Sequence, residues 1–207
     1  VTGDLDSRPM QCPFFVPMQY AILIDAGFLK HKLGSALSPM GLNNVRGLIA
    51  TLRNHPELKD HHLHRIYYYD AAPYLGKQAK PLTSQTIDFS ESSTAVRQSA
   101  LLAEIKKEPF FAVRLGELSF EGWQLKPRLL KDSTHPISIT DTDIIPKISQ
   151  KGVDMRIGMD MAALTLKHIA QILVLVTGDS DFVPAMKFAR REGAAIYMVP
   201  FCLLYTS

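Results

Sequence analysis

The sequence of 207 residues contains only two cysteines, Cys12 and Cys202, which lie near its two ends. This spacing provides neither a disulfide framework nor the clustered ligands of a zinc site. Free thiols are typical of a reducing compartment, so we expect a cytoplasmic protein. The chain also lacks the run of about 18 apolar residues that a membrane-spanning helix needs. Its first 18 residues lack the basic and then apolar pattern of a signal peptide.

No charge of one sign dominates the sequence. Lys and Arg number 23 and Asp and Glu number 20, so the net charge of +3 permits a polyanionic partner without requiring one. Apolar residues make up 46% and charged residues 21%, a composition that excludes wholesale disorder. We predict a loose leader over residues 1–18 and a single domain over residues 19–207, with a hairpin or irregular insertion at about 116–150.

Short apolar runs alternate with helical patterns along the chain. This alternation predicts an α/β fold with a mainly parallel sheet that is covered on both faces. The helix expected over residues 154–170 carries Met155, Met159 and Met161 at helical spacing, so we expect these methionines in the core. Residues 77–92 are rich in Ser, Thr and Gln and predict a loop. The expected strands are 20–24, 65–69, 110–115, 172–176 and 195–199, and the other expected helices are 43–54, 96–107 and 182–191.

Carboxylates occur where these predicted elements meet. Asp25 ends the first strand, Asp154 begins a long helix, and Asp179 and Asp181 follow the most apolar strand. Ligands bind at the carboxyl ends of the strands in open parallel sheets, so Asp25 and Asp179 would face each other if their strands are neighbours. Two like charges about 4 Å apart repel by about 4 kcal/mol at an effective dielectric of about 20. A hard cation such as Mg²⁺ or Mn²⁺ would relieve this repulsion and could activate a water for attack on phosphorus.

Each of these aspartates, taken singly, could instead cap or begin a helix. Taken together, the three segments favour a metal site. Asp160 is a weaker candidate, because it is rotated about 120° from Asp154 around the helix and could pair with Arg156. Asp70 also ends a strand, but no motif surrounds it.

Three segments of the sequence resemble the NYN family of PIN-like nucleases, and the LabA-like bacterial branch is the most similar. They are Ile24–Gly27, Lys151–Met155 with Asp160-Met161, and Thr177–Phe182 with Pro184. The resemblance covers about residues 19–200. It implies a PIN-like three-layer α/β sandwich with a mainly parallel central sheet and an acidic metal-binding pocket. It also implies divalent-metal-dependent endoribonuclease activity.

The resemblance also assigns roles to residues. It implies that Asp25, Asp154 and Asp179 bind Mg²⁺ or Mn²⁺ and that Asp181 completes the catalytic set. By the same resemblance Thr177 and Ser180 are supporting positions. Lys151, which would offset charge on the phosphoryl oxygens, and Asp160 are further supporting candidates. Members of the family often continue into a helix after the last strand, whereas residues 203–207 fit no expected element, so we expect a truncated or foreign end.

RNA binding would require basic and aromatic groups around the acidic pocket. The candidates are Lys126, Arg128, Lys147, Arg156 and Tyr68, with Trp123 as a further stacking surface. The leading hypothesis is a ribonuclease that acts on single-stranded RNA through a metal-activated water. The alternatives are a non-catalytic module that binds RNA or protein and, with less support, a phosphatase or a nuclease on DNA flaps. Self-association is left open, and the lack of a G-x-G-x-x-G motif argues against a dinucleotide-binding enzyme.

Overall fold

The computed structural model describes residues 16–35, 37–130 and 138–199. Its main sheet has the strand order β6-β5-β2-β1-β7-β8, with β5 and β6 antiparallel and the other neighbouring pairs parallel. The predicted α/β fold with a mainly parallel sheet is therefore confirmed. The strands are β1 (Gln19–Asp25), β2 (His62–Ala71), β5 (Phe111–Leu125), β6 (Ile144–Lys151), β7 (Ile172–Val176) and β8 (Ala195–Met198).

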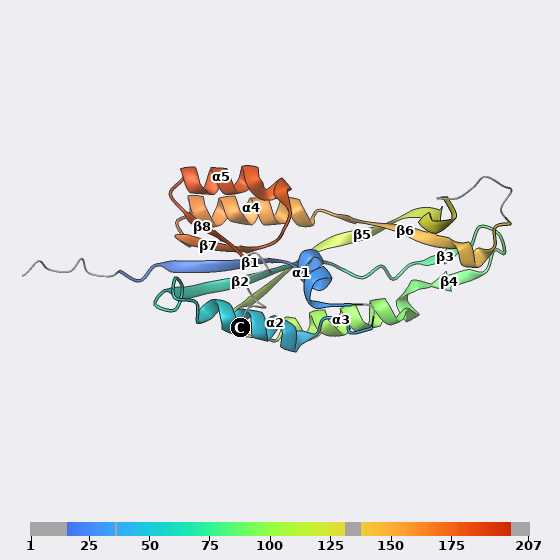
Figure 1. Ribbon diagram of the computed structural model, residues 1–207, viewed down its shortest axis with the longest axis horizontal. Coiled ribbons are helices and arrows are strands. Elements are labelled where there is room, and N and C mark those ends of the chain that lie inside the picture. The colour runs from blue at the N-terminus through green and yellow to red at the C-terminus, as the bar shows by residue number, and fades with distance from the viewer. Residues whose placement is uncertain (1–15, 36, 131–137, 200–207) are drawn as a thin grey trace, which may run out of the picture.

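Helices cover both faces of this sheet, as Figure 1 shows. The helices α1, α2 and α3 lie on one face and α4 and α5 on the other. Within the described ranges, no helix is long and apolar enough to cross a membrane. The helices are α1 (Ala26–Leu33), α2 (Leu42–Arg53), α3 (Ser93–Ile105), α4 (Val153–Leu166) and α5 (Val183–Arg191), and the short 3-10 turn η4 (Ser180–Phe182) precedes α5.

The two helical layers divide the core by the alternation of the strands. In β1, Ile22 and Ile24 pack against the α1–α3 layer, whereas Ala21 and Leu23 pack against the α4–α5 layer. Successive side chains of a strand point to opposite faces of its sheet, so a strand between two layers must be apolar throughout. This requirement explains why the central strands read as unbroken apolar runs.

Two predicted connections contain more regular structure than expected. Residues 77–92, predicted as a loop, contain the antiparallel pair β3 (Lys77–Ala79) and β4 (Thr86–Asp88). In the segment 116–150, β5 continues to Leu125 and pairs with β6, so its described part is a hairpin. This hairpin and the β3–β4 pair extend away from the sheet as an arm (Figure 1).

A β-bulge explains why the sequence did not reveal the full length of β5. The register of the β5–β6 pair shifts between Phe120 and Trp123, where Gly122 has a φ of +113°. A bulge of this kind breaks the alternation of apolar and polar residues. Trp123 packs edge-on against Phe120 at 5.6 Å and donates a hydrogen bond of 2.9 Å to the carbonyl of Ala79. The Trp123 indole therefore joins the two parts of the arm, the β5–β6 hairpin and the β3–β4 pair.

The core face of α4 differs from the prediction. Met155 and Met159 are 71% and 65% exposed, whereas Val153, Ile157 and Met161 are buried against the sheet. Two apolar series with helical spacing run along this helix, and periodicity does not distinguish between them. The prediction was correct for Met161 and wrong for the other two methionines.

Gly116 lies where β5 exchanges its parallel partner β2 for its antiparallel partner β6. A Cβ at this position would lie 2.7 Å from Cγ2 of Val153 and closer still to the carbonyl oxygen of Lys151. The close approach lets the end of β6 and the start of α4 pack directly on β5.

We expect Gly116→Ala to lower the free energy of unfolding by about 1–3 kcal/mol, because the methyl group overpacks this contact. The matched control is Gly47→Ala in α2, where the added Cβ would meet no atom within 4 Å outside its own stretch of helix. That substitution should raise the free energy of unfolding by roughly 0.5–1 kcal/mol through helix propensity. Urea denaturation measures both changes, and an equal effect of the two variants would contradict the contact.

Candidate active site

The carboxyl ends of β1 and β7 and the start of α4 lie at the same end of the sheet (Figure 1). The strands β1 and β7 are parallel neighbours, so the residues that follow them emerge side by side. The helix α4 reaches this edge because β6 runs antiparallel to β5 and returns the chain to it. Gly152, with a φ of +77°, makes the turn from β6 into α4. The topology therefore brings the three acidic segments of the sequence to one edge.

One buried hydroxyl links the first and third of these segments. Thr177 Oγ1 donates a hydrogen bond of 3.1 Å to Oδ2 of Asp25 and accepts one of 3.2 Å from the backbone N–H of Asp179. The other oxygen of Asp25 caps α1 by accepting a 3.2 Å bond from the N–H of Phe28. Asp179 caps η4 through a 2.9 Å bond from the N–H of Asp181. Both carboxylates are therefore held in place. Asp179 rather than Asp181 caps η4, and the N-cap of α5 is Phe182, which makes no side-chain capping bond.

Asp154 lies in the first turn of α4, and the charges of the other acidic residues affect its pKa. Partial loss of hydration raises the pKa of its carboxyl group, although the residue is exposed, and the negative charges of Asp25, Asp179 and Asp181 raise it further. These three charges lie near enough to Asp154 to act on its ionisation. The four aspartates that the sequence identified thus form one electrostatic cluster, which we call the acidic site.

The supporting candidates divide into two groups. Thr177 belongs to the acidic site, and Ser180 follows directly after Asp179 in η4. Asp160 lies apart: its carboxylate accepts a 2.9 Å hydrogen bond from the Tyr69 hydroxyl and pairs with Arg114 at 3.1 Å. The predicted pairing of Asp160 with Arg156 is not found among the described residues. This network joins α4 to β2 and β5, which is a structural role.

Tyr68 cannot stack on RNA, so this prediction was wrong. Its ring is completely buried in the α1–α3 layer, because it is on the opposite face of β2 from Tyr67 and Tyr69. Burial raises the pKa of its hydroxyl far above the ordinary value, and the charges of Asp70 and Asp25 add to the shift. A central strand between two helical layers has no solvent-facing side on which an aromatic ring could bind a base.

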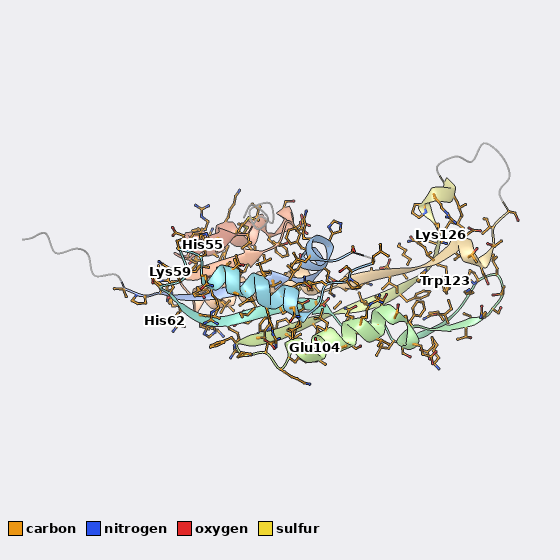
Figure 2. All side chains as sticks on the ribbon, turned by 60° about the horizontal axis from the view of Figure 1, so that its bottom comes forward. His55, Lys59, His62, Glu104, Trp123 and Lys126 are labelled. Carbon is orange, nitrogen blue, oxygen red and sulfur yellow. The ribbon has the colours of Figure 1, made fainter. Side chains whose placement is uncertain are left out.

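The basic candidates are not gathered at the acidic site. Figure 2 shows Lys126 at the far end of the arm, near Trp123, and Arg128 follows it in the chain. Lys147 is paired with Glu121 at 3.2 Å on the same hairpin. Lys151 lies 3.8 Å from Glu121, close to the start of α4. Only Lys151 and Arg156, an exposed residue of α4, flank Asp154 in the chain.

An ion pair beside the acidic site was missed from the sequence. Asp70, at the end of β2, is only 3% exposed, and both of its oxygens accept hydrogen bonds from Nζ of Lys30 at 2.8 and 2.6 Å. Gln98 donates a 2.6 Å bond to the neighbouring carbonyl of Ala71. The position of Asp70 after a strand was the available signal, but Lys30 lies 40 residues away and no spacing rule connects them.

The chemistry of the acidic site suits a divalent cation, but its side chains are not arranged around one. Carboxylate oxygens are the ligands that Mg²⁺ and Mn²⁺ prefer. In the part of the chain that the structure describes, no three Asp, Glu, His or Cys side chains are grouped as a metal site. The Asp154 and Asp181 side chains are exposed, and no hydrogen bond to a described residue fixes their carboxylates. Rotation of these two side chains would be needed for coordination.

The model of the NYN domain matches residues 87–202, more than half of the chain. The chain belongs to the NYN domain family. This family is PIN-like and generally nuclease-like, and nucleases of this type typically use divalent metals. The match contains Asp154, Asp179 and Asp181 and begins after Asp25, which lies on a central strand of the same sheet. The LabA-like branch stays a prediction.

Other comparisons add little. The chain is similar to a crystal structure of a protein of unknown function, VPA0982, from Vibrio parahaemolyticus, with 17% identity and a TM-score of 0.45. The similarity covers 89% of this chain and 83% of that one. A likeness of this size supports no conclusion about function. No curated protein sequence matches the chain significantly.

The raised pKa of Asp154 predicts how the acidic site affects stability. A carboxyl group whose folded pKa exceeds its unfolded value of about 3.9 opposes folding when it is ionised. Without divalent cations, Asp154→Asn should therefore raise the free energy of unfolding at pH 7 by roughly 0.5 kcal/mol, a size typical of exposed charges.

The stabilisation should shrink as the pH falls through the folded pKa of Asp154 and should vanish below the unfolded value. Urea denaturation at several pH values measures this profile, with Asp60→Asn, at an exposed turn position outside the cluster, as the control. A stabilisation that is equal for both variants, or that persists unchanged in acid, would contradict the proposed repulsion.

Proposed function

We propose that this protein is a divalent-metal-dependent endoribonuclease that hydrolyses phosphodiester bonds of single-stranded RNA. The observation that carries the proposal is the electrostatic coupling of Asp154 to Asp25, Asp179 and Asp181 at the carboxyl edge of the sheet. Membership of a nuclease-like family supports it. A cytoplasmic location and self-association stay predictions, and Cys12 and Cys202 lie outside the described residues.

Asp25, Asp154 and Asp179 would hold Mg²⁺ or Mn²⁺. When bound there, such an ion would supply an activated water and would neutralise charge on the phosphate. The Thr177 hydroxyl fixes Asp25, and the cap of η4 fixes Asp179, so two carboxylates have their orientation before a ligand arrives. Asp154 and Asp181 are exposed and can turn toward the ligand.

The remaining residues act on the substrate. Asp181 would orient the attacking water and accept its proton, since its carboxylate is not used as a helix cap. Lys151 is 62% exposed and only loosely paired with Glu121, so its ammonium group would offset charge on the phosphoryl oxygens. Ser180, which lies between Asp179 and Asp181 in η4, would donate a hydrogen bond from its hydroxyl group to the phosphate.

One observation favours the second candidate, a non-catalytic module that binds RNA or a protein. Both oxygens of Asp25 and one oxygen of Asp179 are already engaged in hydrogen bonds, and no group of three ligands is formed among the described residues. An acidic site of this kind could serve only to hold the edge of the fold together. Cleavage assays separate the two candidates.

The purified protein should cleave a single-stranded RNA in the presence of Mn²⁺ or Mg²⁺ and should stop when EDTA is added. Asp154→Asn should lower the rate by about 100-fold or more, a loss in the range found when a group that stabilises a transition state is removed. Asp60→Asn removes an equal charge far along the chain and should retain the rate. Gel analysis of a labelled RNA measures cleavage, and activity that survives both EDTA and Asp154→Asn would overturn the proposal.

A second readout does not depend on activity. A cation that binds only the folded protein stabilises it by about 1.4 kcal/mol when its concentration is ten times its dissociation constant. Mn²⁺ should therefore raise the unfolding temperature of the wild-type chain, and the increase should be lost in Asp154→Asn. Thermal unfolding monitored by circular dichroism tests this, with Asp60→Asn as the variant that should keep the response.

A further inference from the structure

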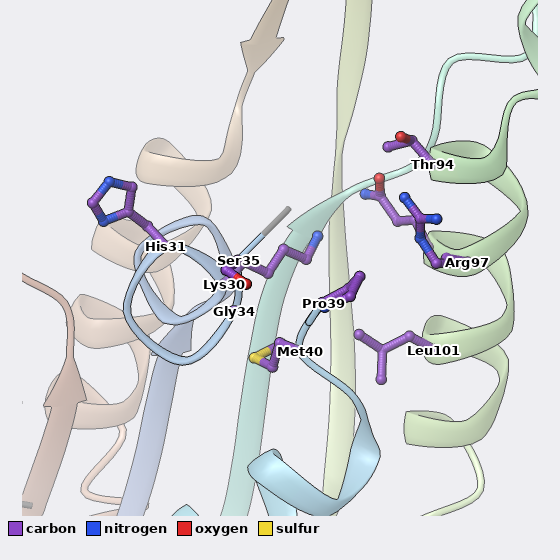
Figure 3. A pocket seen from close by; sticks show the side chains of 10 residues that line it. Lys30, His31, Gly34, Ser35, Pro39, Met40, Thr94, Arg97 and Leu101 are labelled. Carbon is purple, nitrogen blue, oxygen red and sulfur yellow. The ribbon is translucent and has the colours of Figure 1, made fainter. Parts of the chain in front are cut away.

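A cavity of about 440 Å³ opens between α1, the chain before α2, and α3 (Figure 3). We call it the α1–α3 pocket. Its volume lies in the range of small-molecule sites, roughly 300–1,000 Å³. One part of its lining is apolar and the other is polar. The apolar residues are Pro39, Met40 and Leu101, and the polar residues that face them are Lys30, Arg97 and Gln98.

The polar wall on the α1 side is fixed in place. Lys30 extends across the cavity toward α3 in Figure 3, and its ammonium group is hydrogen-bonded to both oxygens of the buried Asp70. An ammonium group has three N–H donors, so one donor remains for a ligand. The two N–H groups of the Gln98 amide are already used, one by the carbonyl of Ala71 at 2.6 Å and the other by Oδ1 of Asp70 at 3.4 Å. A ligand would therefore meet the remaining donor of Lys30 in a position that is already set, which lowers the entropic cost of binding.

Arg97 supplies the charge of the α1–α3 pocket. It projects from α3 into the lining, is exposed, and forms no ion pair with any residue that the structure describes. The charge of Lys30 is balanced by Asp70, so the uncompensated positive charge belongs to the guanidinium group. A guanidinium group binds phosphate through two parallel hydrogen bonds. The apolar floor beside it, which includes the polarisable sulfur of Met40, suits a flat aromatic base.

The α1–α3 pocket adjoins the acidic site through two elements. Asp25 caps α1, and Lys30 lies five residues later, a rise of about 7.5 Å along the helix. In the sheet, Asp25 is paired with Tyr69, so Asp70 at the pocket follows directly beside the acidic site. A chain of nucleotides can thus reach both places by crossing the start of α1.

We propose that the α1–α3 pocket binds one nucleotide of an RNA strand whose scissile phosphate lies at the acidic site. Its base rests on Met40, Pro39 and Leu101, and its phosphate is bound by Arg97 with Lys30. This inference rests on the proposed function and assigns the part of the site that holds the substrate beside the reacting phosphate.

The test measures binding of a fluorescently labelled single-stranded RNA by anisotropy with Mn²⁺ present, using the full chain with Asp181→Asn, which prevents cleavage and leaves the three proposed metal ligands in place. Adding Arg97→Ala or Arg97→Gln should weaken binding about tenfold or more, the change expected when a charged hydrogen bond worth about 1.5 kcal/mol is lost. The control is Arg190→Ala, an exposed arginine of α5, which should bind as the parent does. Thermal unfolding verifies that the Arg97 variants remain folded.

Three outcomes would overturn the inference. Equal binding by the Arg97 and Arg190 variants excludes the α1–α3 pocket as an RNA subsite, and if the wild-type chain still cleaves RNA, the proposed function is unaffected. A free nucleoside monophosphate that binds as tightly as RNA, and in an Arg97-dependent way, identifies a pocket for free nucleotides instead. If the parent binds no RNA and the wild-type chain cleaves none, both the inference and the proposed function fail.

Discussion

The hydrogen bond from Thr177 to Asp25 is the interaction on which the acidic site depends. It joins the ends of two neighbouring parallel strands, and the same hydroxyl accepts the N–H of Asp179. The ring of Phe28 packs against Gly178, where a Cβ would come within 3.1 Å of its Cδ2 atom, so the turn after β7 lies directly on α1. Two aspartates that are 154 residues apart in the chain are therefore set relative to one another by local capping and by one buried hydroxyl.

The third aspartate reaches the same edge by a different route. The helices α1 and α5 follow parallel strands whose carboxyl ends lie at this edge. The helix α4 instead follows β6, which is antiparallel to β5 and belongs to the hairpin of the arm. The chain returns along β6, turns at Gly152 and starts α4 against Gly116. The arm is thus part of how Asp154 is positioned. Placing four carboxylates together costs electrostatic free energy, which the buried core of the sheet must offset.

The core strands and the aspartates of the acidic site were predictable from the sequence, because local patterns determine them. A strand between two helical layers is an unbroken apolar run, and the aspartates directly follow such a strand or begin a helix. The exposed side of α4 was not predictable, since its two apolar series are equally periodic. Tyr68 was misjudged because an aromatic residue in a central strand is buried whichever way it points. The Lys30–Asp70 pair and the α1–α3 pocket arise from contacts between distant segments, which no spacing in the sequence records.

The Lys30–Asp70 ion pair also affects how charge is distributed along this edge of the sheet. Asp70 ends the strand beside Asp25, and as an unpaired carboxylate it would extend the negative field of the acidic site toward α3. Lys30 neutralises the charge of Asp70, and on the same side of the edge the exposed Arg97 of the α1–α3 pocket adds a positive charge. If the protein acts on RNA as proposed, a strand that crosses α1 would be attracted at the α1–α3 pocket and repelled at the acidic site until a cation is bound. Metal binding and strand binding would then be interdependent.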